Sequence, residues 1–105
     1  MSAETVELAE TDFRALALRL ASVALEVAGF IDPDVETTIG MNAYGRGAIS
    51  ILVHEPAPMD TAATLAKRID LRAYRLCNGY RHEWSGTIDG FAAQVNWLEP
   101  KDDDQ

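Results

Sequence analysis

The sequence has few of the residues that cross-link a protein, bind a metal or anchor it in a membrane. It contains one cysteine, Cys77, and two histidines, so an internal disulfide and a cysteine-based zinc cluster are both excluded. Its longest apolar-rich region, residues 15–31, is interrupted by Arg19 and Glu26, and this interruption excludes a membrane-spanning run. We predict a protein without disulfides, cofactors, metals or membrane contacts, in a reducing, cytoplasmic compartment.

Basic residues are also scarce. Nine Lys and Arg stand against 17 Asp and Glu, which gives a net charge of −8 and disfavours general binding to nucleic acid. The chain length predicts a single domain over residues 1–105, and the N-terminus lacks the basic start of a signal peptide. The charged ends, residues 1–10 and 99–105, are predicted to be flexible.

No motif of catalysis or phosphate binding is present: the sequence lacks GxGxxG, GxxxxGK[ST] and HExxH. Two His-Glu dipeptides occur, at His54-Glu55 and His82-Glu83. Neighbouring residues on a strand point to opposite faces of a sheet, so neither dipeptide is expected to form a paired site. We assign no catalytic residue and no metal ligand.

Residues 11–28 are predicted to form a helix, capped by Thr11 or Asp12 and ended by Gly29 in the left-handed conformation. One apolar stripe at helical spacing comprises Phe13, Leu16, Leu20, Val23, Ala24 and Val27. A second stripe comprises Leu18, Ala21 and Leu25. A helix that is apolar over more than half its circumference is either wedged between two layers or packed against another chain. The second stripe is therefore the candidate surface for self-association, and a homodimer is one predicted state.

Two hairpins follow from alternation and turn chemistry. Around the loop 43–47, Thr37, Ile39 and Met41 face Val53, Ile51 and Ile49 on one apolar side. Asp89-Gly90 is suited to a two-residue type I′ turn, and folding about it places Trp84 and Trp97 on one apolar face. We interpret the two Trp residues as core rather than as a binding site.

Between the hairpins, Asp60 is predicted to cap a helix that ends near Ile69 and is followed by a strand; the alternative is a helix continuing to Asn78-Gly79. The expected fold class is α+β, with an antiparallel sheet of four to five strands and two helices on one face. The expected order is helix, hairpin, helix, hairpin. The open face is expected to carry Thr38, Leu52, His54, Ser85 and Gln94, and to form no wide ligand cavity.

Residues 67–81 reverse the charge, with five basic residues and one acid. Arginine beside tyrosine is typical of interface hot spots and of platforms for single-stranded nucleic acid. The candidate partner-binding residues are Tyr44, Arg46, Arg72, Tyr74, Arg75, Tyr80 and Arg81. The alternative is that these arginines only neutralise nearby acids such as Asp70 and Glu83.

The segment "TLAKRIDL" followed by W-x-G-T-x-x-G resembles small uncharacterised proteins of actinobacteria and their phages. The residues concerned are Leu65, Ala66, Leu71, Trp84, Gly86, Thr87 and Gly90, within about the last forty residues. The resemblance implies a small accessory domain, and it implies no site residue.

These observations lead to one main hypothesis and two alternatives. The main hypothesis is a non-catalytic accessory protein of a phage or mobile element, which binds a host or phage protein stoichiometrically as an inhibitor or as a mimic of nucleic acid. The first alternative is a small-molecule binder or small enzyme using His82, Glu83 and the loop at residues 44–47. The second is an RNA-binding domain using the Arg/Tyr residues.

Overall fold

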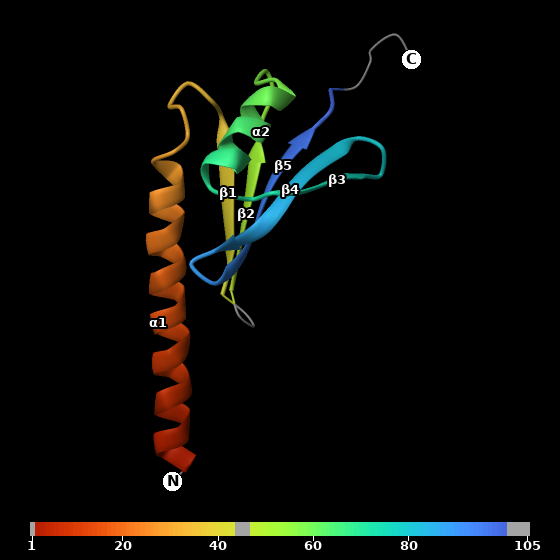
Figure 1. The fold of residues 1–105 in the computed structure, drawn as a ribbon. Helices are drawn as coiled ribbons and strands as arrows, with labels where there is room; N and C mark the ends of the chain where they lie inside the picture. Colours follow the sequence, from red (N-terminus) through yellow and green to blue (C-terminus); the bar gives the residue numbers. More distant parts are fainter. Residues whose placement is uncertain (1, 44–46, 101–105) are drawn as a thin grey trace.

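The computed structural model describes residues 2–43 and 47–100, with residues 2–12 as backbone alone. Two helices and five strands follow one another along the chain (Figure 1). They are α1 (Ser2–Ala28), β1 (Thr37–Asn42), β2 (Ala48–Val53), α2 (Met59–Arg68), β3 (Ala73–Cys77), β4 (Arg81–Ile88) and β5 (Phe91–Leu98). The predicted α+β class is confirmed. Neither described helix is long and apolar enough to cross a membrane.

The five strands form one mixed sheet in the order β1-β2-β5-β4-β3, in which β2 and β5 are parallel and all other pairs are antiparallel. The prediction of a purely antiparallel sheet was therefore wrong. The predicted order of helix, hairpin, helix, hairpin is met only in part, because three strands, β3, β4 and β5, follow α2. After β2 the chain crosses the sheet through α2, so β3 begins at the same end of the sheet as β2. Three strands then alternate in direction, and the last of them, β5, runs parallel to β2.

Both predicted hairpin registers are confirmed. Ile39 pairs with Ile51 in the first hairpin, and Trp84 pairs with Val95 in the second. Asp89 and Gly90 have φ values of 52° and 86°, as a type I′ turn requires. The registers were predictable because a slip of one residue would move every apolar side chain to the wrong face.

The segment after the first hairpin is a helix followed by a strand, as predicted. The residue at the N-cap of α2 is Pro58, with extended backbone angles and no side-chain capping bond, so the prediction that Asp60 caps this helix was wrong. Asp60 lies instead in the first turn, where a carboxylate is favoured by the helix dipole. Ile69 ends the helix, its N–H bonded to the carbonyl of Leu65.

Helix α1 differs from its prediction at both ends. It begins at Ser2 rather than at Thr11, because residues 2–10 are rich in Ala, Glu and Leu, which favour helix. Gly29 does not adopt the left-handed conformation; its N–H continues the helical pattern by bonding to the carbonyls of Leu25 and Glu26. Figure 1 shows α1 running along the sheet and continuing beyond the ends of the strands.

One hydrophobic core lies between the sheet and the two helices. Its buried members are Leu20, Val23, Val27, Ile49, Ile51, Val53, Ala62, Leu65, Ala66, Ile69, Leu71, Trp84, Phe91, Ala93, Val95 and Trp97. The sheet residues in it all come from one face, so both helices cover that face. Both Trp residues lie in the core, as predicted, and the Trp97 indole N–H donates to the carbonyl of Ala57 at 2.8 Å.

Candidate functional site

The adjacent residues His82 and Glu83 lie on opposite faces of the sheet. His82 pairs with Trp97 on the face covered by the helices, and Glu83 pairs with Asn96 on the other face, called here the open face. A catalytic pair of His82 with Glu83 is thereby excluded. The two histidines also lie on different faces, because His54 bonds to Thr38 on the open face, with 2.7 Å between Thr38 Oγ1 and His54 Nε2.

The open face holds a buried carboxylate between two arginines. The Glu83 side chain is 7% exposed, and each of its oxygens faces a different guanidinium. Arg75 Nε donates to Oε2 at 2.9 Å, and Arg81 Nη1 lies 3.6 Å from Oε1. Burying a carboxylate is costly unless it is paired and hydrogen-bonded, and both conditions are met here.

This pairing extends across the sheet to β5 and β2. Arg81 Nη1 also donates to Asn96 Oδ1 at 3.4 Å. The Asn96 amide in turn donates to Ser50 Oγ and to the carbonyl of Ile51, both at 3.4 Å. Arg75, Arg81, Glu83, Asn96 and Ser50 together form what we call the open-face cluster. It includes residues of β2, β3, β4 and β5, and so fixes the relative position of these four strands.

The Arg75 guanidinium is held in its charged form. Its hydrogen bond to Glu83 raises its pKa, and the charge of the Glu83 carboxylate adds to that effect. Cys77, the one cysteine in the sequence, is half-buried at the end of the same strand. It has no described histidine beside it to act as a base, since His54 bonds to Thr38 and His82 lies on the other face.

The open face is hollowed beside this cluster. A shallow cavity of about 790 Å³ is lined by residues of all five strands, most of them small or polar. The prediction that no wide cavity would form here was wrong. It rested on the shortage of large apolar groups, whereas the hollow arises because glycine, alanine and serine dominate its floor: Gly40, Ala48, Ser50, Ser85, Gly86, Ala92 and Ala93.

On the covered face, His82 connects a tyrosine to the C-terminal segment. The Tyr74 hydroxyl lies 2.5 Å from His82 Nδ1, and His82 Nε2 lies 3.0 Å from Glu99 Oε1. Because a carboxylate can only accept, Nε2 donates to Glu99, and in the neutral ring Nδ1 then accepts from the tyrosine. The rings of Trp84 and Trp97 pack beside this chain of bonds. The hydrogen bonds from Tyr74 through His82 to Glu99 link the edge strand β3 to β4 and hold the Glu99 side chain in place.

The five predicted partner-binding residues that the structure describes do not form one surface. Tyr74 lies on the covered face, whereas Arg75 and Arg81 lie on the open face. Arg72 pairs with Asp70 at 2.6 Å, and Arg75 and Arg81 both pair with Glu83, so each of the three arginines lies beside an acid named in the alternative interpretation. Tyr80 is exposed in the turn between β3 and β4. The remaining two, Tyr44 and Arg46, lie outside the described residues.

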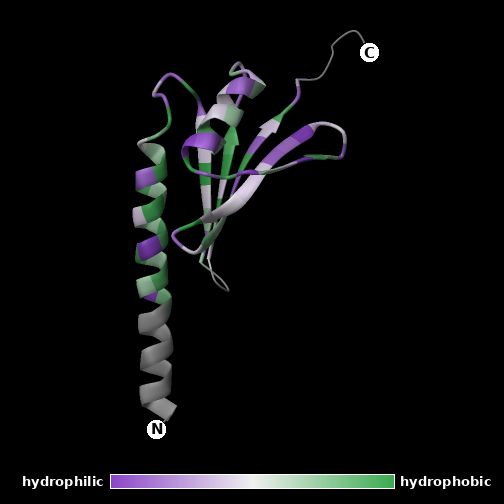
Figure 2. Cartoon of the chain, in the orientation of Figure 1, coloured by the Kyte–Doolittle hydropathy of each residue, from purple (hydrophilic) through white to green (hydrophobic). Residues whose placement is uncertain are grey.

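The second apolar stripe of α1, called here the outer stripe, remains exposed. Leu18 is 72% exposed and Leu25 is 75% exposed, while Ala21 between them is partly buried. Figure 2 shows that the described part of α1 is largely hydrophobic, although the sheet lies along one side of it. The helix is thus not wedged between two layers of its own chain.

Among the described residues, no group of three or more His, Cys, Asp and Glu side chains could hold a metal ion.

Three residues that take part in these hydrogen-bond networks were not predicted from the sequence. Asn96 and Ser50 belong to the open-face cluster, and Glu99 is the partner of His82. Asn96 lies opposite Glu83 in the second hairpin, whereas Ser50 reaches Asn96 only through the parallel pairing of β2 with β5. Glu99 was assigned to a flexible tail, and no local pattern marked it as a partner of His82.

Comparison with protein families, curated proteins and solved structures finds no match to this chain. The class is therefore defined by the fold alone: a small α+β domain with a mixed five-stranded sheet, covered on one face.

Proposed function

We propose that this chain is a non-catalytic accessory protein that acts by stoichiometric binding to another protein, and that the outer stripe of α1 is its docking surface. One observation carries the proposal: two leucines at more than 70% exposure on the same side of a helix. A single exposed leucine is ordinary, whereas a continuous apolar strip on a surface helix is a feature of interaction sites.

The geometry of the stripe suits a helical partner. Leu18, Ala21 and Leu25 recur at intervals of three and four residues, so they align along one side of the helix. The small residues Ala21 and Ser22 lie between the leucines and allow a second helix to approach closely. We infer that the partner contributes an apolar helix stripe, either from a different protein or from a second copy of this chain.

The test is affinity capture of the tagged chain from a lysate of the cells in which it acts, combined with a measurement of the chain's mass in solution by light scattering. We expect the wild-type chain to form a complex of defined stoichiometry, and the double variant Leu18→Ser, Leu25→Ser to lose it while keeping the wild-type circular dichroism spectrum. A wild-type mass of two chains that becomes one chain in the variant would assign the stripe to a homodimer.

The matched control is Leu76→Ser, because Leu76 is a half-exposed leucine on the edge strand β3. This variant should retain the complex. Loss of the complex in the control, with retention in the stripe variant, would move the docking surface to the β3 edge and refute the assignment to α1.

A further inference from the structure

We propose that the open face carries a second site, which binds a small oxyanion group, a phosphate monoester or a carboxylate, through Arg75 and Arg81, with Glu83 as the residue that positions both. This site is separate from the outer stripe and does not depend on it. The argument rests on the charge of the open-face cluster, on its geometry and on the hollow beside it.

The charges of the cluster do not balance. Arg75, Arg81 and Glu83 are the charged residues among the described residues that line the hollow, and together they leave one positive charge. A structural ion pair would need only one arginine for the buried carboxylate. The two guanidiniums that contact Glu83 therefore carry one positive charge more than this carboxylate neutralises, in a protein whose net charge is −8.

The geometry prepares both guanidiniums for a ligand. The two carboxylate oxygens of Glu83 each engage one arginine, so Glu83 fixes both side chains on the same face of the sheet before a ligand arrives. Arg75 uses its Nε edge for Glu83, yet its side chain remains 68% exposed. Ordering the arginines in advance removes much of the entropy cost of binding, and a planar guanidinium suits the paired oxygens of phosphate and carboxylate.

The hollow supplies space and further hydrogen-bond donors. Its volume of about 790 Å³ is in the range of small-molecule sites. Ser50, Ser85 and Gln94 lie side by side on three adjacent strands in the row next to Glu83. The side-chain amide of Gln94 makes no hydrogen bond to another residue that the structure describes, so it is available to a ligand.

The residues that line the hollow argue against a nucleic acid as its ligand. None of the described residues that line the hollow is aromatic, so the stacking that single-stranded nucleic acids require is missing. A compact ligand with one oxyanion group matches a surplus of one positive charge, whereas a polyanion would meet the repulsion of the acidic remainder.

The experiment is a titration of the ¹⁵N-labelled full chain with inorganic phosphate and, separately, with succinate, at constant ionic strength. We expect saturable shifts of the Arg75 and Arg81 Nε–Hε signals and of the Ser50 and Ser85 amides, with Arg72 unaffected. Saturation by phosphate alone identifies a phosphate ester, and saturation by succinate alone identifies a carboxylate. Shifts that do not saturate with either anion would overturn the proposal.

Two variants separate a built site from general attraction. Arg75→Lys keeps the charge but loses the planar fork, and it should weaken binding by about tenfold. The matched control Arg72→Lys changes an exposed arginine outside the hollow and should leave binding unchanged. Equal weakening by both would contradict the proposal. Gln94→Ala leaves the three charged groups intact and should also weaken binding, which keeps the test valid if Arg75→Lys fails to fold.

Discussion

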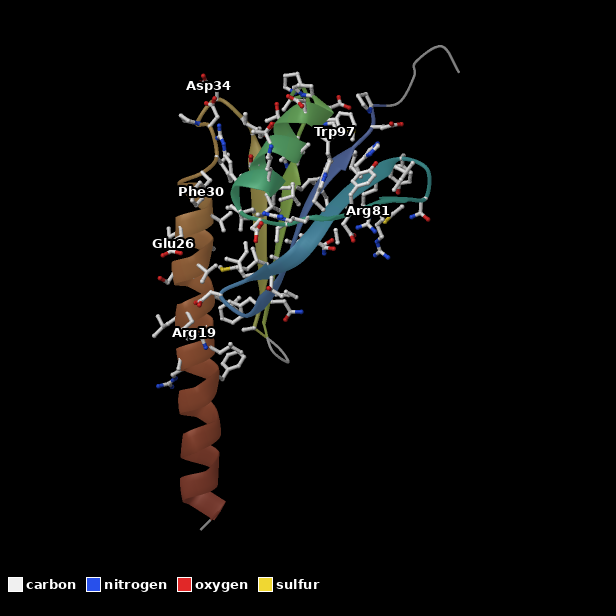
Figure 3. The ribbon with its side chains drawn as sticks, viewed as in Figure 1. Arg19, Glu26, Phe30, Asp34, Arg81 and Trp97 are labelled. Atoms are coloured by element: carbon white, nitrogen blue, oxygen red, sulfur yellow. The ribbon has the colours of Figure 1, made fainter. Side chains whose placement is uncertain are left out.

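Two leucines on α1, two positions apart, have opposite environments. Leu20 is 1% exposed and packs in the core near Gly47 and Phe91, whereas Leu18 is 72% exposed. Arg19, labelled in Figure 3, stands between them in the sequence. Its guanidinium carbon lies over the Phe91 ring, 5.0 Å from the ring centre. The fold therefore buries one apolar stripe of this helix, whereas both leucines of the other stripe stay exposed among the residues that the structure describes. Exposed leucines aligned along one side of a helix, unlike a single exposed leucine, suggest an interaction surface.

The largest loss of stability is expected from a substitution in the first apolar stripe of α1, called here the inner stripe, which includes Leu20. Leu20→Ala removes a fully buried side chain and leaves a cavity beside Phe91, which should lower the free energy of unfolding by about 2–5 kcal/mol. Urea unfolding followed by circular dichroism measures the change. A loss of unfolding free energy as small as that expected at an exposed position would contradict this account, because it would mean that the inner stripe does not hold α1 against the sheet.

A smaller effect is expected where the buried group is polar. Glu83→Gln keeps the shape of the side chain but removes the charge that both arginines contact, so we expect a loss of about 1–3 kcal/mol. The comparison is with Gln94→Leu on the same face, whose side chain has no described partner and should cost far less. Similar losses for the two variants would show that the open-face cluster does not stabilise the sheet.

The smallest effect on stability is expected on the outer stripe. Leu18→Ala exchanges one good helix former for another at an exposed position, so the free energy of unfolding of the dilute chain should change by less than about 0.5 kcal/mol. Chemical unfolding at low protein concentration checks this. A loss comparable to that of Leu20→Ala would place Leu18 in the core and remove the basis of the docking surface.

The sequence predicted the local features of the fold because each had a local physical cause. Alternation fixed the registers around Ile39 and Trp84, and Asp89-Gly90 fixed the tight turn. The parallel junction of β2 with β5 had no such cause, because strand order depends on the path of the chain after α2 and not on the composition of either strand.

The sites were predictable only in part for the same reason. The outer stripe was visible from helical spacing alone, since its residues are near neighbours in the sequence. The open-face cluster was not, because Glu83 and Asn96 meet across one hairpin whereas Ser50 reaches Asn96 only through the parallel junction. The prediction instead grouped Tyr74 with Arg75, which strand alternation places on opposite faces.

The most direct test of the docking surface is site-specific photo-crosslinking in living host cells. A photoreactive phenylalanine analogue would replace Ser22, which is exposed beside the outer stripe, and in a parallel experiment Thr64, which is exposed on α2. The account predicts one defined covalent adduct with another polypeptide from position 22 and none from position 64. An adduct from position 64 alone, or no adduct from either position, would contradict it.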